Sequence, residues 1–447
     1  MSEADVVAAG VVGLVRAFQQ GALTPTDAAR AYVSRIRRYD GKLNAYRVPA
    51  SDLADEAAAS TRRWRAGLPK GPLDGVPIAV KSNIAVRGLP HDAGIGAFRN
   101  RPAEADAEAV RRLRASGALI LGTLNMEEGA LGAKTDNPWF GPTFNPWREG
   151  YTPGGSSGGS GAAVAAGLCA AALGTDTMGS VRIPASYCGV TGLKPPRGAV
   201  PDEGLVPLSP TLDTIGPLAR SVADVGAVYG MIAGEAVQAP GAVTVKVAAA
   251  LASSAALAAT ERAADALRQS GLDVGPAALP DDLFGPVRRA GLLVTEAEGH
   301  AALGAAMAAD PDGFSAFLTK MLTYGATAPQ ERVEAARAAL AAAEDAFARS
   351  GADVLLLPTT PTPAFAMNED HADQADLTAF ANAAGLAAVS VPFGLADGLP
   401  VGVQAVGRTV GAVLAVAARI EAAAPPLGLP PGYEPEKSGG RFARKAS

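Results

Sequence analysis

The sequence predicts a large mixed α/β fold, and three features of the chain indicate it. Short apolar stretches typical of buried strands alternate with amphipathic stretches typical of helices. The chain has 447 residues, of which 48% are hydrophobic, so it can bury a sizeable core in one or two domains. Near the C-terminus, "AAVSVPFGLADGLPVGVQAVG" indicates two strands joined by a turn at Asp397-Gly398.

The N-terminal part of the chain predicts helices and two buried strands. Residues 1–20 indicate a helix, without the basic start of a signal peptide. A second helix begins after Thr24, whose hydroxyl can cap it. Its apolar stripe consists of Ala28, Ala29, Tyr32, Val33 and Ile36. Strands are predicted at 76–81 and 118–124, and a third helix ends at Gly117, just before the second strand.

The same alternation continues in the C-terminal part. Strands are predicted at 244–251, 272–275 and 353–359, and helices at 256–271 and 330–351. This repeated alternation, together with the C-terminal hairpin, favours a large mixed α/β fold.

Composition and cysteine usage exclude several classes of protein. The net charge is −5 and no basic stripe stands out, so nucleic acid is not expected as a direct partner. Cys169 and Cys188 form no CxxC pair, and His91, His300 and His371 are scattered, so neither a metal site nor a disulfide scaffold is predicted. Sparse cysteines suit a reducing cytoplasm. No stretch is apolar enough to span a membrane.

The Gly/Ser stretch "TPGGSSGGSGAAVAAG" at residues 152–167 admits several interpretations. A phosphate-binding P-loop needs a lysine after the glycines, and none follows. A dinucleotide-binding loop needs a small residue where Val164 stands. A flexible linker would not continue into an apolar helix. The interpretation that remains is a tight loop that places serines at the start of a helix, in an active site.

A nucleophilic serine needs a base, and the sequence offers Lys81. No histidine lies near the loop, and the G-x-S-x-G elbow is missing. Lys81 ends the buried run "VPIAVK", where burial would lower its pKa and keep it neutral. Taken alone, a lysine at a strand end is more often simply solvated.

Several blocks of this sequence together resemble the amidase signature family. They are "GVPIAVKSNI", "GTLNMEEGALG", "NPWFGPTFNPW", "PGGSSGGSGAAVAAG", "LGTDTMGSVRIPASYCGVTGLKP", "LDTIGPLARSVADV", "DVLLLPTTPTPA" and "GLPVGVQAVG". The resemblance implies one α/β/α domain over residues 1–430, with a large mixed, mostly parallel twisted sheet covered by helices on both faces. Within it, residues 280–330 would be variable and shape a substrate pocket. Residues 431–447 would form a polar, basic tail.

The resemblance also implies a Ser–cis-Ser–Lys triad. Ser180 in "MGSVRIP" matches the nucleophile, Lys81 matches the base, and Ser156 matches the serine that bridges them. The peptide bond between Gly155 and Ser156 is expected to be cis. Amide hydrolysis would proceed through an acyl-enzyme on Ser180, with the proton relayed by Ser156 to neutral Lys81.

Further residues around the nucleophile follow from the same resemblance. The expected oxyanion hole consists of the backbone N–H groups of Thr177, Met178, Gly179 and Ser180. Ser157, Asp176 and Arg182 are expected to support the reacting groups. An ordinary structural ion pair and a plain loop hydroxyl are the alternatives for these three. The family commonly has glycine where this chain has Met178, which puts the shape of the pocket wall in question.

The expected function is hydrolysis of a small-molecule amide or ureide to a carboxylate and ammonia or an amine, without a cofactor. The alternative is the glutaminase component of a glutamyl-tRNA(Gln) amidotransferase complex, and a non-catalytic scaffold is a more distant one. Met126 and Leu131 are candidate substrate contacts, with core packing as the alternative. The family also implies a possible homodimer.

Overall fold

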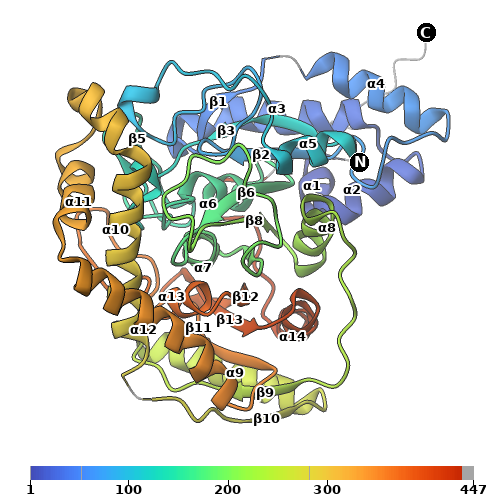
Figure 1. The fold of residues 1–447 in the computed structure, drawn as a ribbon. Coiled ribbons are helices and arrows are strands. Elements are labelled where there is room, and N and C mark those ends of the chain that lie inside the picture. The colour runs from blue at the N-terminus through green and yellow to red at the C-terminus, as the bar shows by residue number, and fades with distance from the viewer. Residues whose placement is uncertain (1, 52, 281, 435–447) are drawn as a thin grey trace.

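The computed structural model describes residues 2–51, 53–280 and 282–434, and it confirms the predicted α/β class (Figure 1). Its centre is an 11-stranded sheet with the order β1-β3-β2-β6-β8-β7-β12-β13-β11-β9-β10. These strands are β1 (Tyr46–Pro49), β2 (Pro77–Lys81), β3 (Leu119–Leu124), β6 (Ala171–Asp176), β7 (Thr191–Lys194), β8 (Thr214–Ala219), β9 (Thr244–Val247), β10 (Asp273–Pro276), β11 (Val354–Pro358), β12 (Ala387–Ala396) and β13 (Leu399–Gly407). A separate small hairpin pairs β4 (Asp136–Asn137) with β5 (Gly141–Pro142).

The sheet is mixed, as predicted, but most of its neighbouring strand pairs are antiparallel, which corrects the expectation of a mostly parallel sheet. Parallel pairs join β2 to β3 and β6, and β9 to β10 and β11. Every neighbouring pair from β6 across to β11 is antiparallel. The β12–β13 hairpin contributes one of these pairs, and its turn lies at Asp397-Gly398 as predicted. Both turn residues have positive φ, 49° and 75°, as a tight hairpin turn requires.

Helices surround the sheet. They are α1 (Glu3–Ala8), α2 (Gly10–Gln19), α3 (Pro25–Leu43), α4 (Ala54–Arg65), α5 (Glu108–Ala115), α6 (Gly158–Ala165), α7 (Arg182–Cys188), α8 (Val222–Ala233), α9 (Ser254–Gln269), α10 (Phe284–Ala309), α11 (Ala316–Thr327), α12 (Gln330–Arg349), α13 (Ala379–Ala383) and α14 (Val410–Ala423). The start of α3 is as predicted, since the Thr24 side chain accepts a hydrogen bond from the Asp27 N–H. None of the described helices is both long and apolar enough to cross a membrane.

Strand β11 shows that both faces of the sheet are covered. Val354 and Leu356 belong to the largest hydrophobic cluster, which also contains buried residues of α9 and α14. Leu355 and Leu357 belong to a second cluster, which contains residues of α10 and α12. Successive side chains of a strand point to opposite faces, so the two clusters lie on opposite sides of the sheet.

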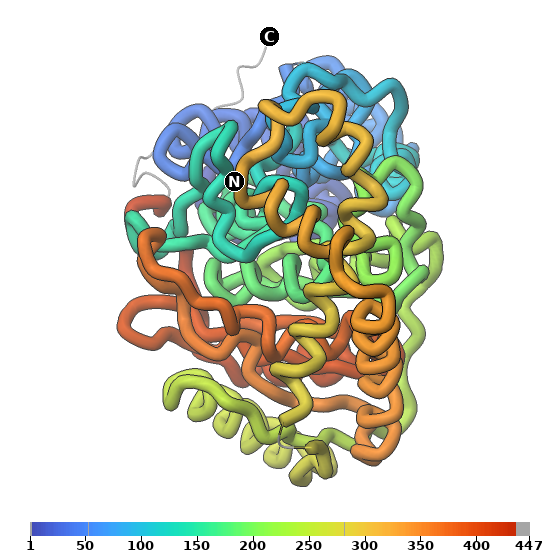
Figure 2. The backbone as a smooth tube through the Cα atoms, turned by 60° about the vertical axis from the view of Figure 1, so that its left-hand side comes forward, coloured from blue at the N-terminus to red at the C-terminus, as the bar shows by residue number. Residues whose placement is uncertain are grey.

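The region at 280–330, which was expected to vary and to shape a substrate pocket, is mostly helical over the residues that the structure describes. It forms α10, α11 and a short 3₁₀ turn at Pro311–Gly313 between them. In Figure 2 the gold to orange path of α10, α11 and α12 runs along the side of the molecule that faces the viewer. Residues of α10 and α11 line the main cavity described below.

The two ends of the described chain differ in detail from the sequence predictions. The N-terminal helix is broken into α1 and α2 at Ala9. The boundary expected at residue 430 comes too early, because Tyr433 is buried and its carbonyl accepts a hydrogen bond from Arg35 at 2.6 Å. Most of the expected tail, residues 435–447, lies outside the described residues.

Candidate active site

Lys81 lies at the carboxyl end of β2, and its side chain is fully buried. Its Nζ donates hydrogen bonds to Ser156 Oγ at 2.7 Å and to Thr175 Oγ1 at 2.8 Å. Thr175 stands on β6, the strand next to β2 in the sheet. Burial lowers the pKa of Lys81 from 10.5 to about 7, although the carboxylates of Asp213, Asp176 and Glu127 act in the opposite direction. The lysine is therefore half neutral near pH 7.

The Gly/Ser loop brings Ser156 to this lysine. The Gly155–Ser156 peptide bond is cis, as the family resemblance implies. Both Ser156 and Ser157 are completely buried. Ser157 Oγ donates to the Thr175 carbonyl at 3.1 Å and accepts from the Thr175 N–H at 3.2 Å, which ties the loop to β6. The helix that follows the loop lies so close to Asn125 that position 159 must be glycine, since a Cβ on Gly159 would lie 2.3 Å from the Asn125 carbonyl oxygen.

Ser180 lies in the loop between β6 and α7, next to the Gly/Ser loop. Its carbonyl accepts a hydrogen bond from the Ser157 N–H at 3.2 Å. Ser180 is 8% exposed and lines the main cavity, whereas Ser156 and Lys81 are fully buried and are not among the residues that line it. The loop between β6 and α7 thus places Ser180 in the cavity wall, whereas the Gly/Ser loop places Ser156 in contact with Lys81.

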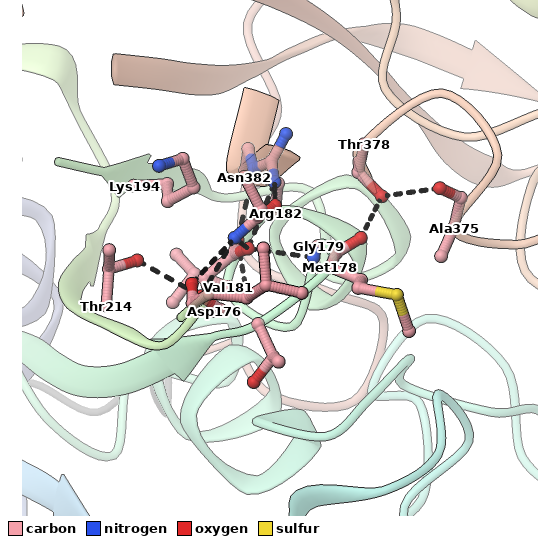
Figure 3. Close-up of polar contacts among 12 residues, drawn as sticks. Asp176, Met178, Gly179, Val181, Arg182, Lys194, Thr214, Ala375, Thr378 and Asn382 are labelled. Atoms are coloured by element: carbon pink, nitrogen blue, oxygen red, sulfur yellow. Dashed lines mark hydrogen bonds and ion pairs between the residues drawn. The ribbon is translucent and has the colours of Figure 1, made fainter. Parts of the chain in front are cut away.

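A buried ion pair holds both ends of the Ser180 loop (Figure 3). Arg182 Nη2 and Asp176 Oδ1 are 3.0 Å apart, and neither side chain is exposed. Asn382 and Gln404 also contact the arginine, because their side-chain oxygens accept hydrogen bonds from Arg182 at 2.7 Å and 3.0 Å. Burial would raise the pKa of Asp176, but Arg182 outweighs it and the pKa falls to about 2. Asp176 is therefore a carboxylate at every pH at which the protein is expected to work.

The backbone of the loop is held from both sides at the Met178–Gly179 peptide (Figure 3). Thr378 Oγ1 donates to the Met178 carbonyl at 2.6 Å, and the Gly179 N–H donates to Asp176 Oδ1 at 2.7 Å. The predicted oxyanion hole needs correction at Gly179, because its N–H already has this partner. Among the hydrogen bonds of the described residues, none engages the N–H groups of Thr177, Met178 or Ser180.

The cavity in front of Ser180 has a volume of about 600 Å³. Its wall is mainly apolar and includes Leu131, Ile183, Leu208, Leu292 and Met321, with charged groups such as Arg288, Lys134 and Asp370 among the lining residues. Leu131 thus lines the cavity, and its contact with substrate stays a prediction. The prediction for Met126 is wrong, because its side chain is fully buried in a hydrophobic cluster and does not line the cavity.

Comparison with known proteins settles the family. The family model described as Amidase matches residues 27–257 and 241–412 of this chain. The chain belongs to the amidase family. The amidase is similar to the A subunit of the glutamyl-tRNA(Gln) amidotransferase from Anaeromyxobacter sp. (strain K). The two are 36% identical over 92% of this chain and 95% of that relative.

Solved structures agree with this assignment. A crystal structure of an amidase superimposes with a TM-score of 0.87 at 33% identity, covering 93% of this chain and 100% of that one. A peptide amidase from Stenotrophomonas maltophilia gives a TM-score of 0.81 at 30% identity, covering 92% of this chain and 96% of that one. The amidase is therefore an amidohydrolase that acts on C–N bonds.

Several polar residues around the site were missed by sequence reasoning. They are Thr175, Asp213, Thr378, Asn382 and Gln404. Asp213 accepts from Thr177 Oγ1 at 2.6 Å and from two backbone N–H groups, so it fixes the start of the Ser180 loop. Thr175 and Gln404 are polar residues inside the buried strands β6 and β13. Because a buried polar group needs a hydrogen-bond partner, their presence in apolar stretches could have marked them as site residues.

No group of three or more His, Cys, Asp or Glu side chains in the described ranges is arranged to hold a metal ion. Cys188 is buried, and its thiol donates to the Pro153 carbonyl at 3.3 Å. Burial raises the pKa of this thiol far above its ordinary range, which keeps it unreactive.

Proposed function

We propose that the amidase hydrolyses a carboxamide through an acyl-enzyme on Ser180. The observations that carry this proposal are the 2.7 Å hydrogen bond between buried Lys81 and Ser156 and the position of Ser180 in the cavity wall, with its carbonyl bonded to the N–H of Ser157. A lysine with a pKa of about 7 can accept a proton near neutral pH, which an ordinary lysine cannot.

In the proposed mechanism, Ser180 Oγ attacks the carbonyl carbon while its proton passes to Ser156, whose own proton passes to Lys81. The N–H groups of Thr177, Met178 and Ser180 are the proposed donors to the developing oxyanion. The proton then returns along the same route to the leaving nitrogen, and the C–N bond breaks. Water, activated by the same relay, hydrolyses the ester on Ser180 and releases the carboxylate.

Ser180→Ala tests this mechanism, with Ser160→Ala as the matched control. Ser160 belongs to the Gly/Ser run that carries Ser156, but its hydroxyl donates to the Leu173 carbonyl rather than to Lys81 or Ser156. We expect ammonia release from a panel of amides, ureides and glutamine to fall on the order of 10³-fold or more in Ser180→Ala. Ser160→Ala should retain turnover. Equal loss in both variants would contradict the assigned role of Ser180.

A second candidate concerns the physiological amide. The relatives named as A subunits of glutamyl-tRNA(Gln) amidotransferases favour glutamine hydrolysis within a complex over a stand-alone enzyme. The same panel separates the two candidates. Turnover of amides by the isolated chain supports a stand-alone amidase. Ammonia from glutamine only after the partner protein is added supports the complex. The cytoplasmic location and the homodimer stay predictions.

A further inference from the structure

The side chain of Met178 forms part of the wall of the cavity that Ser180 also lines. Both residues line the cavity, and Met178 stands two positions before Ser180 on the same loop. The family resemblance leads us to expect glycine at this position. This chain instead places a thioether there, and the thioether packs against a hydrophobic cluster that contains residues of α10, α12 and α13.

Hydrogen bonds of the backbone fix the orientation of the Met178–Gly179 peptide and so restrict the direction of the Met178 side chain. Its carbonyl is held by Thr378, and the next N–H is held by Asp176. Both sides of the Met178–Gly179 peptide therefore have buried partners, so this peptide cannot rotate without losing two hydrogen bonds. The position of the Met178 Cβ relative to Ser180 is set by the same contacts.

The thioether of Met178 packs against helix α10 at Gly291. Arg288, Leu292 and Thr295 line the cavity and recur at the spacing of one helix face. Gly291 lies on this face, and it is buried. A Cβ on Gly291 would lie 3.0 Å from the Met178 Sδ and 3.7 Å from its Cγ. The space that a side chain at Gly291 would fill is thus occupied by the side chain of Met178.

We propose that Met178, seated on Gly291, selects the acyl group by excluding branching at the carbon next to the scissile carbonyl. Because Met178 and Ser180 line the same cavity two residues apart, the thioether would limit the space beside an acyl group on Ser180, where a methylene would fit and a branched carbon would not. The proposal rests on the proposed function of Ser180. It applies to simple unbranched amides and to glutamine alike, because the side-chain amide of glutamine also follows a methylene.

Isomeric acyl donors test the proposal without assuming a particular amine. Acylation by p-nitrophenyl butyrate and p-nitrophenyl isobutyrate would be followed by nitrophenolate release, and the modified serine identified by mass spectrometry. The variants are Met178→Ala, Gly291→Ala and their combination. Met307→Ala is the matched control, because Met307 also lies on the α10 side of the pocket in a separate cluster but does not line the cavity.

The unaltered protein should prefer butyrate by about tenfold or more, the discrimination that one misplaced methyl group gives. Met178→Ala should remove most of this preference, and Gly291→Ala should increase it by pressing the thioether toward the cavity. The double variant should return toward the original ratio, whereas Met307→Ala should leave the ratio unchanged.

Two kinds of failure are distinguishable. Labelling that persists in Ser180→Ala would overturn the proposed function. Labelling that depends on Ser180, with the same butyrate preference in Met178→Ala as in the unaltered protein, would overturn the specificity proposal alone.

Discussion

The pH dependence of turnover follows from the burial of Lys81. With a pKa of about 7, only about a tenth of the lysine is neutral at pH 6 and about nine tenths at pH 8. If neutral Lys81 is the base, kcat/KM rises about tenfold over this interval and is then level. A lysine with the ordinary pKa of 10.5 would instead give a rate that continues to rise about tenfold per pH unit toward pH 10.

The assay is the initial rate of ammonia release at constant ionic strength, between about pH 5.5 and 10. The key variants are Lys81→Arg and Lys81→Ala. Arginine keeps a cation and N–H donors near Ser156, but it stays protonated throughout this range. Both variants should therefore lose on the order of 10²–10⁴-fold in kcat. Near-normal activity of Lys81→Arg, or a profile that still climbs at pH 9, would refute the role of Lys81 as a neutral base.

Three further predictions concern the surroundings of the relay. Arg182→Met leaves the carboxylate of Asp176 buried without its cation, so the free energy of unfolding in urea should fall by about 3–5 kcal/mol. Thr378→Val releases the Met178 carbonyl, so kcat should fall about tenfold with little change in KM, and Thr378→Ser should restore it. In Lys81→Met, removal of a buried lysine should raise the Tm. Because the folded pKa of about 7 lies below the ordinary 10.5, this gain is full below pH 7 and disappears as the pH rises toward 10.5.

Local elements and the motif-bearing residues were predictable from the sequence. The start of α3 follows from a capping threonine, and the β12–β13 turn follows from Asp397-Gly398, because each depends on neighbours in the chain. The contact between Lys81 and Ser156 was expected from the family motifs. No local rule would have placed these two residues together.

Features that depend on distant partners were not predictable. The break between α1 and α2 is one example: Gly10 has a φ of 61°, and a Cβ there would lie 2.3 Å from the Asp224 carboxylate. The directions of the central strands are another, since a fully buried strand reads as the same apolar run in either direction. Met126 was misplaced because an apolar residue near a motif can face either the core or the cavity.

The hydrogen bond from Arg182 to Gln404 links residues that are 222 positions apart in the chain. A chain emerges from the ribosome N-terminus first, so Lys81, Ser156 and Ser180 are all synthesised well before β13. Until then Asp176 and Arg182 lack the amide groups of Asn382 and Gln404 that complete their contacts. The loop that carries Ser180 thus acquires its final contacts only after β13 has been synthesised, and a nascent chain that ends before β13 lacks the Gln404 contact although it contains all three residues.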